Sequence, residues 1–195
     1  MKNKSVSSFS HKQQVDIVMK WFHPKLNLES IGLRAGMVFM DIGCGYGFFT
    51  IPAAQIVAEQ GKVYAVDVSA SAINRLKHEA AEKGLKNVTA RVDAAEETVF
   101  CEACADIVFY SIVLHDFRDS AKVLRNAKRM LKPSGTLVDL DWKKKSTVFG
   151  PPLRIRFSEE QAATLVKHAG FTIESVKDLG RNFYIVTAKP WSSPI

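Results

Sequence analysis

Residues 37–47 have the sequence Met-Val-Phe-Met-Asp-Ile-Gly-Cys-Gly-Tyr-Gly, in which an apolar run ends at a carboxylate and passes into three alternating glycines. The apolar part, residues 37–42, has the length of a buried β-strand. The glycines permit a tight turn and let a ligand approach the backbone closely. With a helix expected from about Phe48, the stretch predicts a strand, a glycine-rich turn and a helix in succession.

The rest of the chain repeats this alternation of short apolar runs and amphipathic helices, which is typical of a parallel sheet covered on both faces. Further runs of strand length lie at 62–68, 87–92, 106–111 and 136–140. The pattern therefore predicts a doubly wound α/β fold.

Capping residues mark the expected helices. Ser69 is placed to cap the helix that follows the second strand. Another helix is expected to begin near Asp119 or Ser120, to bury Leu131 as its last apolar residue and to stop before Pro133 and Gly135. A third is expected after Ser158, which forms a capping-box pattern with the glutamine three residues later.

Two β-rich runs close the sequence, at 171–176 and 182–188. Parallel neighbours need a crossover of a dozen or more residues, and the connection here is much shorter. We therefore expect an antiparallel hairpin at this end of the sheet.

The chain has 195 residues, 47% of them apolar and 24% charged, which fits one globular domain. We expect a helical cap in residues 1–30, with an amphipathic helix at 15–22 that ends at Pro24. The main domain is expected at 31–189 and a tail at 190–195. The formal charge of +7 permits a nucleic-acid partner but does not indicate one, because no long block of like charge occurs.

Three cysteines form a sparse and odd set, which favours a reduced, cytoplasmic location. Neither a signal peptide nor an apolar run long enough to span a membrane is evident. Cys101 and Cys104 have the spacing of zinc or redox pairs, but the sequence offers no second ligand pair and no helix start there, so both functions are disfavoured. Cys44 is expected to be a packing residue, and no metal site is expected.

Asp67 ends the second apolar run, about 20 residues after the glycines, where an acidic side chain can accept hydrogen bonds from ribose hydroxyls. An alternative is a solvated turn or a charge at the start of the next helix. A nicotinamide dinucleotide fingerprint would place glycine or alanine at position 48, where this chain has Phe48. Asp41 would also repel phosphates, whereas it suits a ligand with an ammonium group.

The segment 41–47 together with Asp67 resembles the class I S-adenosylmethionine-dependent methyltransferases, and the resemblance extends from about Gly32 to Lys189. The segments 105–116 and 131–135 are similar to the branch that contains the ubiquinone and menaquinone methyltransferases. This resemblance implies a Rossmann-like sheet of seven strands, mostly parallel, with the last strand antiparallel.

The resemblance also implies which residues bind S-adenosylmethionine. Asp41 would organise the turn, Asp67 would hold the ribose and Val68 would pack on the adenine. Ser111 would lie beneath the sulfonium. The remaining expected cofactor residues are Gly43, Gly45 and Gly47 at the methionine moiety and Asp93 and Ala94 at the adenine amino group. Asp93 has an alternative interpretation as the cap of a turn.

His115 and Asp116 follow the fourth strand, where an acceptor would meet the methyl group, and they are the candidate catalytic residues. The alternative for His115 is a hydrogen-bonded histidine in a loop. The long connection from Trp142 to Arg156, with three consecutive lysines, either covers the active site or is a solvated loop.

The function expected from these observations is methyl transfer from S-adenosylmethionine to an unidentified acceptor, most simply a small molecule. RNA or protein methylation is the alternative within the same chemistry, although residues 111–114 lack the Asn-Pro-Pro-Tyr type of motif used on nucleic-acid bases. A nicotinamide oxidoreductase and a non-catalytic nucleotide- or RNA-binding module are the hypotheses from other classes. The sequence leaves the oligomeric state open.

Overall fold

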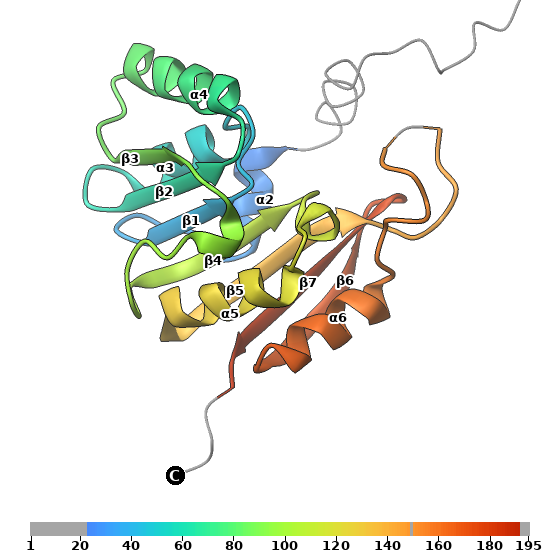
Figure 1. Cartoon of the computed structure of the whole chain (residues 1–195). Coiled ribbons are helices and arrows are strands. Elements are labelled where there is room, and N and C mark those ends of the chain that lie inside the picture. Colours follow the sequence, from blue (N-terminus) through green and yellow to red (C-terminus); the bar gives the residue numbers. More distant parts are fainter. Residues whose placement is uncertain (1–22, 149, 192–195) are drawn as a thin grey trace, which may run out of the picture.

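The computed structural model describes residues 23–148 and 150–191. Its strands form one seven-stranded sheet in the order β3-β2-β1-β4-β5-β7-β6 (Figure 1). Their bounds are β1 Val38–Ile42, β2 Lys62–Asp67, β3 Val88–Val92, β4 Ala105–Ser111, β5 Leu131–Trp142, β6 Phe171–Leu179 and β7 Phe183–Pro190. The first five strands in this order, β3, β2, β1, β4 and β5, are parallel to one another, and β7 is antiparallel to both β5 and β6. The predicted fold and the predicted hairpin are confirmed.

Helices cover both faces of the sheet, as the parallel strands require (Figure 1). One face packs against α2 and α3 through Leu28 and Val57, and α4 covers the same face of β2 and β3. The other face packs against α5 and α6. The helix bounds are α2 Pro24–Ser30, α3 Thr50–Val57, α4 Ala70–Glu82, α5 Ser120–Met130 and α6 Glu159–His168, with short 3₁₀ turns η2 Ala95–Glu97 and η3 Leu114–Asp116.

Side-chain caps explain where the helices begin, and those predicted at Ser69 and Ser158 are present. Ser69 Oγ accepts a hydrogen bond from the Ala72 amide at 3.3 Å, and Asp119 Oδ1 accepts one from the Lys122 amide at 2.8 Å. Ser158 and Gln161 form a reciprocal capping box. These contacts satisfy amide groups that the first turn of a helix leaves without partners.

Some boundaries differ from the prediction. The helix expected from Phe48 begins at Thr50, because the glycine turn continues to Phe49. Leu131 is not the last residue of α5: it is the first of β5, where it pairs with Ala105. The next pair joins Ile107 to Thr136, so residues 132–135 bulge out of the sheet, and this is where proline and glycine indicated a turn.

The described residues include only part of the predicted helical cap at 1–30 and of the predicted tail at 190–195. The amphipathic helix expected at 15–22 lies outside the described residues. Pro24 occupies the first turn of α2, where its missing amide hydrogen costs no hydrogen bond. At the other end Pro190 still belongs to β7 and pairs with Phe171, while residues 192–195 are not described.

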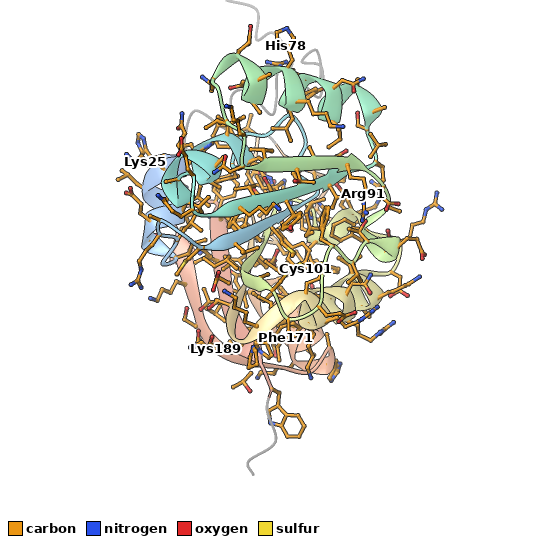
Figure 2. The ribbon with its side chains drawn as sticks, turned by 90° about the vertical axis from the view of Figure 1, so that its left-hand side faces the viewer. Lys25, His78, Arg91, Cys101, Phe171 and Lys189 are labelled. Carbon is orange, nitrogen blue, oxygen red and sulfur yellow. A yellow bond between two sulfur atoms is a disulfide. The ribbon has the colours of Figure 1, made fainter. Side chains whose placement is uncertain are left out.

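Cys101 and Cys104 form a disulfide, whereas the cysteine count led us to expect free thiols (Figure 2). Ala103 adopts a positive φ of 48° between them, which turns the chain and leaves the two Cα atoms 6.1 Å apart. Cys44 is a buried free thiol, as its expected packing role requires. In the ranges 23–148 and 150–191, we find no helix with the length and apolarity needed to cross a bilayer.

Candidate functional site

The glycine turn lies at the carboxyl edge of the parallel strands, directly after β1. Gly43, Gly45 and Gly47 have φ values of 76°, 52° and 88°, a left-handed backbone that other residues rarely adopt. A Cβ on Gly43 would lie 2.6 Å from a methyl carbon of Val113, and one on Gly47 would collide with Leu76. A Cβ on Gly45 would meet no described atom within 4 Å apart from its chain neighbours, so Gly45 faces open space.

Asp67, the last residue of β2, points at this turn. Its Oδ2 accepts a hydrogen bond from the Gly45 amide at 2.9 Å, and its Oδ1 accepts one from the Ser69 amide at 2.8 Å. A carboxylate oxygen can accept more than one hydrogen bond, so Asp67 retains acceptor capacity for a ligand. Asp67 therefore ties the glycine turn to the start of α4 and also presents a carboxylate at the carboxyl edge.

Asp41 lies beneath the turn and is buried. Its Oδ2 accepts a hydrogen bond from Thr50 Oγ1 at 2.5 Å, which links the end of β1 to the start of α3. Burial raises the pKa of Asp41 from 3.8 to about 7; the Thr50 hydrogen bond opposes this rise, and the charge of Asp67 adds to it. A cation near the turn would favour the ionised form of Asp41.

Asp93 follows β3 and lies next to Asp67, since the Asp93 amide donates to the Asp67 carbonyl at 3.1 Å. Its Oδ1 accepts from the Ala94 amide at 2.9 Å, which matches the turn-capping alternative, and its Oδ2 lies 3.5 Å from Arg91. Val68 is 73% exposed beside these groups. The structure therefore brings the predicted ribose and adenine residues to one edge.

Ser111 ends β4 on the same edge. Its hydroxyl is buried and has no hydrogen-bond partner among the described residues. The next residue, Ile112, has a φ of 57°, an unusual conformation for a β-branched side chain, and its amide donates to the Leu140 carbonyl at 2.8 Å. This bend sets Val113 against Gly43 and directs the chain into η3.

His115 and Asp116 lie on η3. His115 Nδ1 is 2.7 Å from Asp141 Oδ2 at the end of β5, and both side chains are about 1% exposed. His115 Nε2 is 3.6 Å from Asp116 Oδ1, and the Asp116 side chain is 58% exposed. Burial alone would lower the pKa of His115, but the hydrogen bond and charge of Asp141, with the charge of Asp116, raise it above 6.5.

Behind this pair lies a second buried carboxylate, Asp139. It lies two residues before Asp141 on the same face of β5 and between Tyr110 and Val186 on the neighbouring strands. Burial and the charge of Asp141 raise the pKa of Asp139 well above its usual value. The Tyr184 hydroxyl interacts with Asp139 without the geometry of a full hydrogen bond.

The connection from β5 to α6 is held by Arg156, which is almost fully buried. Its guanidinium lies over the Trp142 ring at 4.8 Å and donates to the carbonyls of Pro151, Lys143 and Lys145. The charge of Asp141 also acts on Arg156. Arg156 thus holds both described parts of the connection, residues 143–148 and 150–158, next to the His115–Asp141 pair.

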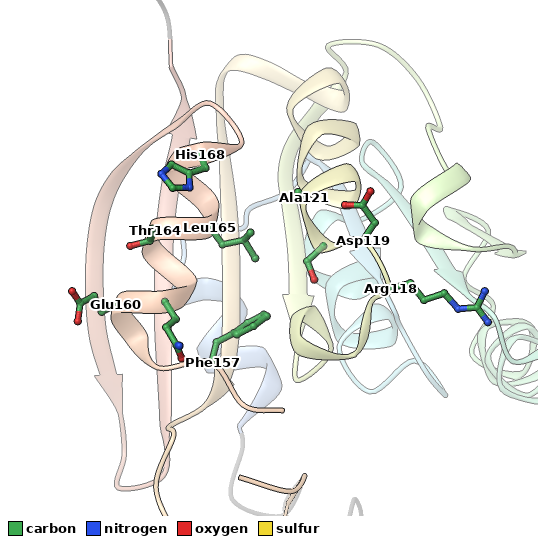
Figure 3. Close-up of a pocket in the computed structure, with 10 residues that line it drawn as sticks. Arg118, Asp119, Ala121, Phe157, Glu160, Thr164, Leu165 and His168 are labelled. Carbon is green, nitrogen blue, oxygen red and sulfur yellow. The ribbon is translucent and has the colours of Figure 1, made fainter. Parts of the chain in front are cut away.

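A groove of about 560 Å³ lies between the start of α5 and α6 (Figure 3). Its lining includes Arg118, Phe157 and His168 and none of the predicted site residues. We assign the site by the chemistry at the carboxyl edge, not by this groove. Among the described residues, no group of three His, Cys, Asp or Glu side chains is placed to hold a metal ion.

The structure adds four residues that the sequence interpretation did not include among the candidate site residues, namely Asp139, Asp141, Tyr184 and Val113. Asp139 and Asp141 alternate within an apolar strand, and this pattern could have indicated that they lie together, because residues i and i+2 share one face of a sheet. The partner of His115, by contrast, depends on the register of β4 against β5.

Comparison with known proteins gives a family match. The family described as "Methyltransferase domain" matches residues 33–178. A solved structure of a SAM-dependent methyltransferase from Aquifex aeolicus superimposes with a TM-score of 0.84 at 29% identity, covering 93% of this chain and 98% of that one.

Two curated proteins match over shorter ranges. The ubiquinone/menaquinone biosynthesis C-methyltransferase UbiE of Vibrio vulnificus is 33% identical over 128 residues, 65% of this chain and 48% of that protein. The nocamycin O-methyltransferase of Saccharothrix syringae is 31% identical over 110 residues, 56% of this chain and 39% of that protein. The matches thus span about half or less of these relatives' length.

Proposed function

We propose that this chain, which belongs to the family of S-adenosylmethionine-dependent methyltransferase domains, transfers a methyl group to a small-molecule acceptor held beyond the carboxyl ends of β1, β2 and β4. The observation that carries the proposal is the hydrogen bond from the Gly45 amide to Asp67. It holds an open glycine turn against a carboxylate that retains acceptor capacity.

The residues present fit the methyl donor. Gly45 leaves space for a ligand at the turn, and Asp67 and Asp93 lie side by side where the ribose and adenine would be bound. Val68 offers an exposed apolar surface next to them. The buried Ser111 hydroxyl, which has no partner within the described part of the chain, is available to a polar group of the ligand.

S-adenosylmethionine supplies a sulfonium-bound methyl group that a nucleophile displaces in line. The chain's own task is to bind both reactants in that alignment and to exclude water, which can account for several kcal/mol of the barrier. We assign binding of the methionine moiety to the glycine turn, with Asp41 beneath it, and contact with the acceptor to His115 and Asp116.

A small-molecule acceptor is favoured over RNA. The two curated relatives are a ubiquinone/menaquinone biosynthesis C-methyltransferase and a nocamycin O-methyltransferase, and both names indicate small-molecule chemistry. In this chain the three consecutive lysines are engaged by the protein itself: Lys143 pairs with Asp178 and Glu159, and Lys144 and Lys145 bond to Gln161 and to the Arg181 carbonyl. They do not form a free basic stripe for a phosphate backbone.

Calorimetry with S-adenosylhomocysteine tests the proposal. Gly45→Ala should weaken binding at least tenfold, because its methyl group would enter the open space at the turn. Gly84→Ala is the matched control: Gly84 has a similar φ of 66° and equally open surroundings, but it follows α4 at the opposite edge. Absence of binding heat with the wild-type protein at millimolar ligand would refute the proposed function.

A further inference from the structure

A buried histidine–aspartate pair lies between the ends of β4 and β5, beside the position proposed for the acceptor. His115 Nδ1 and Asp141 Oδ2 are 2.7 Å apart, and the other Asp141 oxygen accepts a hydrogen bond from the Trp142 amide at 2.6 Å. Both oxygens of Asp141 are therefore engaged, and the carboxylate is fixed in direction. A fixed carboxylate fixes the orientation of the ring that it binds.

The contact also selects the tautomer of His115. A carboxylate only accepts hydrogen bonds, so Nδ1 must carry the hydrogen when the ring is neutral. Nε2 is then the basic nitrogen. It lies 3.6 Å from Asp116 Oδ1, at the boundary between the buried His115 side chain, which is about 1% exposed, and the Asp116 side chain, which is 58% exposed.

Contacts other than this pair also hold this part of the fold together. The Ile112 amide already joins the end of β4 to the Leu140 carbonyl, and Ser120 Oγ donates to the Leu114 carbonyl at 2.9 Å and so secures η3. A buried ion pair adds little net stability compared with apolar packing. A role in the chemistry of the site accounts for the burial better than a role in stability does.

We infer that Asp141 is a positioning residue, which holds His115 with Nε2 as a base, and that the acceptor's reactive atom carries a proton, as in a hydroxyl or an acidic C–H group. This inference rests on the proposed function. An acceptor that is already an anion would not need this arrangement.

The proposed step is a proton transfer coupled to displacement at the methyl carbon. Nε2 of His115 takes the proton from the acceptor atom, whose electron pair forms the bond to the methyl carbon. The carbon–sulfur bond breaks and its electron pair stays on sulfur, which becomes a neutral thioether. The imidazolium, stabilised by Asp141 and Asp116, then releases its proton to solvent.

The surrounding charges set the pH at which this base works. Asp141 of β5 and Asp116 of η3 favour the imidazolium, and Arg156 before α6 opposes it. Asp139 lies behind Asp141, beside Tyr110 of β4, and Tyr184 of β7 interacts with it. Because a base must be neutral, methyl transfer to a protic acceptor should increase as the pH rises through a value above 6.5.

¹⁵N NMR of the histidine rings tests the tautomer without any acceptor. The sequence has five histidines, and the spectrum of His115→Gln identifies the His115 signals. In the wild-type protein Nδ1 should carry the hydrogen, and in Asp141→Asn, whose amide is a hydrogen-bond donor, the hydrogen should move to Nε2. A wild-type ring protonated on Nε2 would overturn the inference, whether or not Asp141→Asn folds.

Catechol and thiophenol test the acceptor class at mildly alkaline pH, where catechol keeps its protons and thiophenol is ionised. Asp141→Asn should lower methyl transfer to catechol by about 100-fold or more, while transfer to thiophenol changes little. Equal losses with both probes, or wild-type transfer to thiophenol alone, would overturn the inference. If neither probe is methylated, the NMR result decides.

Binding of S-adenosylhomocysteine separates this inference from the proposed function. Asp141→Asn should bind it as the wild-type protein does. Failure of the wild-type protein to bind it would refute the proposed function, whereas normal binding together with the wrong tautomer would refute only the role of Asp141. Asp106→Asn is a suitable control, because Asp106 lies at the start of β4, at the opposite edge.

Discussion

At the scale of single residues, the carboxyl edge combines acids that differ in their surroundings. Asp41 is buried under the glycine turn with one hydroxyl partner, while Asp67 accepts hydrogen bonds from two backbone amides. Burial disfavours the ionised form of Asp41, so a bound cation would act on its charge state, whereas two amide donors fix the direction of the Asp67 carboxylate. We therefore propose different purposes for the two carboxylates, one responsive to a bound cation and one a fixed acceptor.

Asp41 should make the stability of the protein dependent on pH. Its pKa is about 7 in the folded chain, above the usual 3.8, so its contribution to stability is fully present below about 4 and is lost as pH rises through about 7. Asp41→Asn, which can still accept from Thr50, should therefore gain stability relative to wild type over that window, by at most on the order of 4 kcal/mol.

Urea unfolding at pH 4 and pH 8 measures this effect. Asp139 has a pKa raised in the same direction, so only the difference between variant and wild type isolates Asp41. A difference in the free energy of unfolding that is the same at both pH values would contradict the prediction.

Asp67→Asn should weaken S-adenosylhomocysteine binding at least tenfold, because a charge-assisted hydrogen bond contributes about 1.5 to 3 kcal/mol. In this variant the side-chain NH₂ group of Asn, which is a donor, would also face the donating amide of Gly45 or Ser69, so one of these hydrogen bonds would be lost. Asp106→Asn is the matched control, since Asp106 likewise accepts from a backbone amide, that of Val38, but at the amino edge. Calorimetry on both variants compares them, and similar affinities would contradict the role given to Asp67.

At the scale of helices and strands, most of the elements could be predicted because their signals are local. The capping box at Ser158 and the caps at Ser69 and Asp119 depend on residues three positions apart. The strand predicted at 136–140 is shorter than β5, which begins at Leu131. Pro133 and Gly135 indicated the end of the preceding helix, so residue 131 was placed in that helix. The bulge at 132–135 accommodates both residues while Leu131 still pairs with β4.

The candidate site was predicted only in part, for the same reason. The glycine turn and Asp67 follow neighbouring strands, and strand order alone brings them together. The contact between His115 and Asp141 joins residues 26 positions apart and depends on which β5 residue lies beside the end of β4. Sequence periodicity does not specify that register.

The capping box of α6 gives a prediction at this scale. Ser158→Ala should lower the free energy of unfolding by about 1 kcal/mol, or the melting temperature by about 2 to 4 °C for a chain of this size. Ser134→Ala, at an exposed serine in the bulge of β5 that makes no side-chain hydrogen bond within residues 23–148 and 150–191, should be neutral in comparison. Thermal unfolding followed by circular dichroism measures both, and equal melting temperatures would contradict the contribution of the cap.

At the scale of the whole molecule, the sheet separates two kinds of edge. The carboxyl edge holds Asp67 and His115, and the amino edge holds the contacts of Asp106 with Lys132 and the disulfide of Cys101. The disulfide is therefore remote from the candidate site.

Reducing the disulfide should therefore affect stability more than binding. The closed loop is only a few residues long, so its loss should cost about 2 kcal/mol or less. Cys101→Ala with Cys104→Ala should lower the melting temperature modestly and leave the affinity for S-adenosylhomocysteine unchanged. Weakened binding in this variant would contradict the separation of the two edges.

The antiparallel direction of β7 also has a mechanical consequence. The chain enters β1 and leaves β7 at the same edge, so tension between Arg34 and Trp191 runs across the strands and opens the β5–β7 hydrogen bonds one after another, beginning at Ala188. Tension between Arg34 and Gly180, at the far end of β6, loads many hydrogen bonds together. In optical tweezers the first pair of handles should unfold the protein at lower force, and equal forces would show that strand direction does not govern its strength under load.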